Sequence, residues 1–132
     1  MTTETTITTP VTPPVTLSAL IRRGAAMPQV KQTYRAFHRG YGEGGTVAVC
    51  VLGAAMFALT GEPPMTNLDA LLTLLSLALG GKGLQQTAPF PLLSEQHPAG
   101  QRLDLLNAVM ALNDEFHWTF AQIATWLEGN NL

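Results

Sequence analysis

The feature that most constrains this chain is a run of 18 residues, Gly44 to Gly61, without a charged side chain. Its central part, Thr46–Thr60, is apolar on every side and offers no polar face to water. A helix of that kind belongs in the centre of a domain, surrounded by other elements. We therefore expect the rest of the chain to fold around Thr46–Thr60.

The first half of this run leaves its secondary structure open. Thr46–Val51 is dominated by β-branched residues, which favour a buried strand. Leu52–Leu59 is rich in Ala, Leu and Met, which favour a helix. We prefer one buried helix over Thr46–Thr60, in which the small residues Gly53, Ala54 and Ala55 would let neighbouring helices approach closely. A strand over Thr46–Val51 stays open.

A membrane location is disfavoured, although the run approaches the roughly 20 apolar residues that a spanning helix needs. It is rich in Gly, Ala and Thr, which insert poorly. The next apolar stretch, Ala70–Leu79, is too short to span. Met1–Val15 lacks the basic and apolar segments of a signal peptide. The one cysteine, Cys50, suits a reducing compartment, so we expect a cytoplasmic protein.

Hydrophobic periodicity and capping residues predict further helices on both sides of the run. The expected fold class is all-α, a compact bundle of about six short helices around the buried apolar helix. Residues 84–100, with three prolines and a glycine, are expected to form a loop. The predicted flanking helices are Thr16 or Ser18 to Ala26, Pro28 to Gly40, Asn67–Leu79, Gln101–Phe116, and a last helix capped by a Thr119–Gln122 capping box.

The domain organisation is predicted to be simple. Residues 1–15 contain mainly Thr and Pro, with few large apolar side chains, and are expected to form a disordered tail. Residues 16–132 are enough for one domain with a single core.

Charge is divided unevenly along the chain. Between Thr5 and Gly42 there are five basic residues and no acid, whereas from Glu43 onward eight acids stand against two bases. The basic residues of the first part are candidates for nucleic-acid contact, because they could neutralise phosphates. The simpler interpretation is that the two halves attract each other within the fold. The candidate contact residues are Arg22, Arg23, Lys31, Arg35 and Arg39.

Catalytic chemistry finds little support in the sequence, and we lean against an enzyme. Cys50 lies among apolar residues that would raise its pKa, which makes it a poor nucleophile. Asp114 and His117 could share a metal ion, but two ligands do not make a site. The glycine-rich segments lack the pattern of a phosphate loop. We therefore expect no cofactor, no metal and no catalytic residues.

The leading functional hypothesis is a non-enzymatic interaction protein that binds a protein partner or itself. The predicted helix Asn67–Leu79 has leucines around most of its circumference and one narrow polar stripe. That is more apolar surface than one neighbour usually covers, and a symmetric homo-oligomer would bury the excess. Leu71 and Leu75 are the candidate interface residues.

Several short pieces, in this order, resemble a group of small uncharacterised bacterial proteins. They are Leu17-Ser18-x-x-Ile21-Arg22-x-Gly24-Ala25, Pro28-Gln29, Cys50-Val51-Leu52-Gly53-Ala54-Ala55, Leu112-Asn113-Asp114 and Trp118-Thr119-x-x-Gln122-Ile123-Ala124-x-Trp126-Leu127. The resemblance covers roughly residues 17–60 and 103–128. It implies a compact intracellular bacterial domain and carries no activity and no functional residues.

Overall fold

The computed structural model describes residues 15–34, 38–41, 47–61, 68–80, 83–92 and 101–132. The expectation of a disordered tail falls on residues that lie outside this part of the chain, apart from Val15. The described elements are α1 (Leu17–Ala25), β1 (Val30–Gln32), β2 (His38–Tyr41), β3 (Val47–Val49), α2 (Val51–Thr60), α3 (Leu68–Ala78), the 3-10 helix η2 (Gly83–Gln85), β4 (Thr87–Pro89), β5 (Arg102–Asp104), α4 (Leu105–Asp114) and α5 (Phe120–Gly129).

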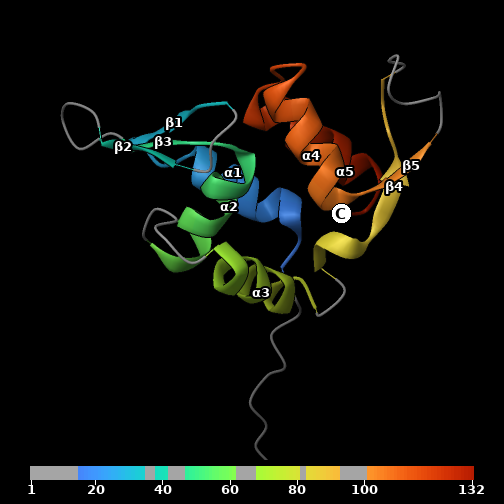
Figure 1. The fold of residues 1–132 in the computed structure, drawn as a ribbon, viewed down its shortest axis with the longest axis horizontal. Coiled ribbons are helices and arrows are strands. Elements are labelled where there is room, and N and C mark those ends of the chain that lie inside the picture. The colour runs from blue at the N-terminus through green and yellow to red at the C-terminus, as the bar shows by residue number, and fades with distance from the viewer. Residues whose placement is uncertain (1–14, 35–37, 42–46, 62–67, 81–82, 93–100) are drawn as a thin grey trace, which may run out of the picture.

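The fold is mixed α/β, so the prediction of an all-α bundle of about six helices is wrong. Two small sheets lie toward opposite ends of the molecule, with the helices between and below them in the view of Figure 1. One sheet has the strand order β1-β3-β2, and the other pairs β4 with β5. The helical part of the prediction holds for α1, α2, α3, α4 and α5, with altered bounds.

The three-stranded sheet is built around β3. β1 runs parallel to β3, pairing Val30 with Val47, and β2 runs antiparallel to it on the other side. Val47 and Val49 are buried, whereas Ala48 between them is partly exposed, which is the alternation of a strand with one face on the core. The strand left open for Thr46–Val51 is present over Val47–Val49, whereas Val51 already begins α2, and Thr46 lies outside the described residues. The single helix over Thr46–Thr60 is wrong.

The predicted helix from Pro28 to Gly40 is also wrong, because β1 and β2 occupy this stretch. A buried strand needs partners for its backbone groups. β3 obtains them here: the Val47 N–H donates to the Gln29 carbonyl at 2.6 Å, and Thr33 N–H donates to the Val49 carbonyl at 2.7 Å. These long-range bonds outweigh a weak helical periodicity, as tertiary contacts routinely do.

α2 forms the centre of the core, as the uncharged run predicts. Its residues from Val51 to Phe57 are all buried. Cys50 is the N-cap, and Gly53 N–H donates to its sulfur at 3.5 Å. The helix ends at Gly61, whose φ of 78° is the left-handed conformation that glycine adopts without strain.

α1 packs directly against α2 through Gly24. A Cβ atom added at Gly24 would overlap the carbonyl oxygen of Ala54 and lie 2.8 Å from its carbonyl carbon. The missing side chain of Gly24 therefore allows α1 to approach the backbone of α2 closely at Ala54. Thr16 caps α1 by accepting a hydrogen bond from Ala19 N–H at 3.1 Å, which confirms the predicted helix start.

The C-terminal half corrects two further predictions. The helix expected from Gln101 begins only at Leu105, because Asp104 accepts a hydrogen bond from Asn107 N–H at 2.8 Å and acts as the N-cap. The three residues before Leu105, Arg102–Asp104, form β5. The expected loop over residues 84–100 contains part of η2 and the strand β4 that pairs with β5.

α5 begins as predicted. Thr119 Oγ1 accepts from Gln122 N–H at 3.1 Å, and Gln122 Oε1 accepts from Thr119 N–H at 2.8 Å, so the capping box is complete. The longest described α-helix, α3, has 11 residues, and none of the helices in the described ranges has the length and apolar character to cross a membrane.

Candidate interaction surfaces

The outer face of α3 carries an apolar surface. Leu74 is 44% exposed and Leu77 is 67% exposed, and they are the two strongly exposed large hydrophobic residues in the described part of the chain. They are three positions apart and therefore lie on the same side of the helix. Leu75, in contrast, is fully buried in the core. We call Leu74 and Leu77 the α3 leucine pair.

The two interface candidates from the sequence are thus placed differently. Leu75 holds α3 to the rest of the molecule and does not reach the surface of the single chain. The side chain of Leu71 lies outside the described residues. The periodicity of leucine alone does not distinguish the inner from the outer side of a helix that is apolar almost all round, so sequence reasoning missed Leu74 and Leu77.

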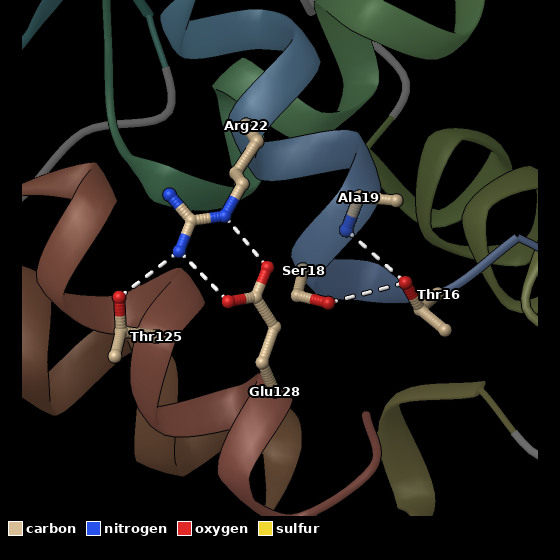
Figure 2. Close-up of polar contacts among 6 residues, drawn as sticks. All are labelled: Thr16, Ser18, Ala19, Arg22, Thr125 and Glu128. Atoms are coloured by element: carbon tan, nitrogen blue, oxygen red, sulfur yellow. Dashed lines mark hydrogen bonds and ion pairs between the residues drawn. The ribbon is translucent and has the colours of Figure 1, made fainter.

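Arg22, the first residue of the basic stretch, is engaged in contacts within the fold. Its Nε donates to one carboxylate oxygen of Glu128 at 2.6 Å, and its Nη2 donates to the other at 2.8 Å (Figure 2). Nη2 also donates to Thr125 Oγ1 at 2.9 Å. This bidentate pair joins α1 to α5 across 106 sequence positions. It is an instance of the two oppositely charged halves attracting each other.

The electrostatic effects within this pair are mutual. The hydrogen bond to Glu128, and its charge, raise the pKa of the Arg22 guanidinium. The hydrogen bond from Arg22, and its charge, lower the pKa of the Glu128 carboxyl group.

Of the other candidate nucleic-acid contact residues, Arg23 and Lys31 are exposed. The side chains of Arg35 and Arg39 lie outside the described residues.

A groove of about 400 Å³ runs along the outer face of α5. Both tryptophans of the chain line it, and each is half-buried. None of the lining side chains is charged, so the groove favours uncharged ligands with flat or apolar surfaces. We call it the tryptophan groove; it is lined by Trp118, Ala121, Gln122, Thr125 and Trp126.

A polar junction lies where β1, α2 and α4 meet. Its centre is Asn113, which is fully buried. Asn113 Oδ1 accepts from Gln32 Nε2 at 2.9 Å and from Val51 N–H at 3.1 Å. Asn113 Nδ2 donates to the Thr33 carbonyl at 3.0 Å and to Asp114 Oδ1 at 2.7 Å. Every polar atom of this amide has a partner, so its evident role is to join the three elements.

Cys50 lies beside this junction, at the start of α2, and is fully buried. Burial raises the pKa of its thiol to about 11, and the negative charge of Asp114 acts in the same direction. The thiol is therefore protonated at neutral pH and is not an activated nucleophile in this structure.

The residues considered for metal binding are arranged differently from a metal site. His117 is exposed, has a φ of 51°, and stacks on Tyr34 with ring centroids 4.1 Å apart. In the described ranges, no three or more His, Cys, Asp or Glu residues come together in a way that could hold a metal ion.

The chain matches no protein-family model, and no curated protein or solved structure shows significant similarity to it.

Proposed function

We propose that the protein is a non-enzymatic interaction protein that self-associates through the outer face of α3. The observation that carries this proposal is the exposure of the α3 leucine pair, at 44% and 67%. Burying a leucine side chain fully stabilises an assembly by roughly 1.5–3 kcal/mol relative to leaving it in water. A second copy of the same chain would cover the pair on both partners at once.

The chemistry of α3 favours a copy of itself as the partner. The helix contains one acid, Asp69 near its start, and no base, so its remaining length is uncharged. In a symmetric dimer the same patch meets itself, and an uncharged strip can do so without bringing like charges together. The chain as a whole has only 12% charged residues, against about 25% for an ordinary soluble domain.

The test is the solution mass of the full chain, measured by size-exclusion chromatography with light scattering. We expect the wild type to be a dimer or larger assembly and the variant Leu74→Glu/Leu77→Glu to be a folded monomer. Leu75→Asp is not a suitable test of self-association, because a charge at a fully buried position would unfold the chain. A matched control is Ala19→Glu/Gln101→Glu, which adds the same charge at exposed positions elsewhere.

The outcomes separate cleanly when circular dichroism confirms that each variant is folded. Loss of assembly in the leucine variant, with assembly kept in the control, supports the proposal. A monomeric wild type across the micromolar range overturns it. So does a leucine variant that keeps the mass of the wild-type assembly.

A further inference from the structure

The tryptophan groove contains two indole N–H groups that the fold does not use. In the described part of the chain, the hydrogen bonds of Trp118 and Trp126 are all made by their backbone groups. An indole N–H donates a hydrogen bond and cannot accept one. Both indoles therefore offer a donor, besides a flat apolar ring, to a ligand in the groove.

The two polar side chains of the lining use their acceptor oxygens within the fold. Gln122 Oε1 accepts from Thr119 N–H at 2.8 Å, and Thr125 Oγ1 accepts from Arg22 Nη2 at 2.9 Å (Figure 2). In the described ranges, neither the Gln122 amide nitrogen nor the Thr125 hydroxyl donates to another residue. The side chains of the groove are thus rich in available donors and poor in available acceptors.

This inventory favours a ligand with many acceptors, few donors and no charge. In a proline segment each proline brings a carbonyl acceptor and an apolar ring, and it has no N–H. A sugar hydroxyl both donates and accepts, and other peptides carry an N–H on each residue, so these ligands would leave donors without partners, at a cost in affinity. The polyproline helix is also preformed and loses little entropy on binding to an aromatic groove.

We propose that the tryptophan groove binds a proline-containing segment of a partner protein in the polyproline conformation. The carbonyl oxygens of the segment accept from the groove donors, and its rings pack on the indoles. The lengths agree: the five helical steps from Ala121 to Trp126 rise about 8 Å, and one turn of polyproline helix is about 9 Å long. Two prolines one turn apart therefore match the length of the groove. This inference does not depend on self-association through α3.

The intrinsic fluorescence of the full chain tests the inference, because both of its tryptophans line the groove. The probe is octaproline with an acetylated N-terminus and an amidated C-terminus, which forms the polyproline helix and carries no charge. We expect the emission maximum to shift to shorter wavelength, with saturation at up to millimolar probe. A blocked peptide of Gly-Ser repeats of the same length, which has an N–H on every residue and no preformed helix, should leave the emission unchanged.

The variant Gln122→Glu tests the role of the donors. Its carboxylate can still accept from Thr119 N–H and complete the capping box, so α5 keeps its cap. The amide donors are lost, and a negative charge faces the carbonyl oxygens of the probe. We expect the dissociation constant for octaproline to rise by about tenfold or more. Gln101→Glu adds the same charge at an exposed position outside the groove and should bind octaproline as the wild type does.

The outcomes are clear once circular dichroism confirms that the variants are folded. The variant Leu74→Glu/Leu77→Glu should bind octaproline as the wild type does, since the groove lies on α5. A wild-type emission that millimolar octaproline leaves unchanged would overturn the inference. Equal dissociation constants for the wild type and Gln122→Glu would also overturn it, because the donors of the groove would then not face the ligand. So would tighter binding of cellopentaose than of octaproline, which would identify a neutral saccharide as the occupant.

Discussion

The side-chain amide of Gln32 donates to Asn113 Oδ1 at 2.9 Å and to the carbonyl oxygen of Trp118 at 2.7 Å. Gln32 belongs to β1 and Asn113 to α4, so this contact fixes the sheet against the end of a helix 81 positions away. The same oxygen of Asn113 accepts from Val51 N–H, the first residue of α2. One buried amide thereby sets the mutual placement of three elements.

Replacing Asn113 should therefore destabilise the whole fold. In Asn113→Leu the Val51 N–H and the Gln32 amide lose an acceptor, and the Thr33 carbonyl loses a donor. A buried polar group left without its partner costs about 1–3 kcal/mol, so we expect a loss of roughly 3 kcal/mol or more in the free energy of unfolding. Urea denaturation followed by circular dichroism measures it.

Asn107→Ala is a suitable control for this variant, because Asn107 lies exposed on the same helix. Removing its side chain removes the hydrogen bond from the Asn107 amide to the Asp104 carboxylate, but it leaves no buried group unsatisfied. We expect it to change the free energy of unfolding by no more than about 0.5 kcal/mol. An Asn113 variant as stable as this control would contradict the structural role of the junction.

The sequence predicts the helical part of this fold well, where local signals decide. Thr16 and Thr119 are caps with partners three residues on, and the uncharged run identifies α2 as the central element. These features depend on neighbouring residues and on apolar content. Local reasoning can therefore find them.

The sheets were not predicted, because each strand has only three or four residues and depends on a distant partner. β1 is recognisable only once β3 offers Val47 and Val49 for pairing, and β4 only once β5 is in place. The same limit applies to the candidate surfaces. Which of Leu74, Leu75 and Leu77 faces outward depends on how α3 is docked, and Asn113 is a junction only because β1 and α2 end beside it.

The Cys50 thiol should make stability depend on alkaline pH. Its pKa in the folded state is about 11, above the ordinary value of 9.0 that it regains on unfolding. Between these values the unfolded chain releases the proton while the folded chain retains it, so stability falls as pH rises. The slope is at most about 1.4 kcal/mol per pH unit for one group.

Other groups titrate in the same range, so the measurement is a difference between two chains. The unfolding free energies of wild type and Cys50→Ala are compared at pH 8 and at pH 10.5. We expect the wild type to lose stability relative to the alanine variant as pH rises. A difference that stays constant would show that the thiol has the same pKa in both states.

Gly24→Ala should destabilise the protein although alanine favours helix by about 1 kcal/mol over glycine. The added Cβ would overlap the Ala54 carbonyl group, which is backbone of α2 and cannot rotate away. Overpacking of this kind costs typically about 1–3 kcal/mol. The two helices would have to move apart.

Gly129→Ala provides the matched comparison, because a Cβ at Gly129 meets nothing within 4 Å and Gly129, like Gly24, lies in the last turn of a helix. We expect this variant to be neutral or slightly more stable than the wild type. Thermal unfolding of both variants checks the pair. Equal melting temperatures in the Gly24 and Gly129 variants would show that α1 and α2 are not in close contact.

The Arg22–Glu128 pair should contribute a small, salt-sensitive stabilisation, because both side chains are more than 40% exposed, at 43% and 45%. The pKa of Glu128 is lowered in the folded state, so this contribution is present at neutral pH and is lost as the pH falls through that lowered value. Arg22→Gln should lower the melting temperature at low salt and lose most of this effect in high salt. Arg23→Gln, at the adjacent exposed arginine, removes the same charge without breaking the pair. If both variants melt at the same temperature at low salt, the Arg22–Glu128 pair does not stabilise the contact between α1 and α5.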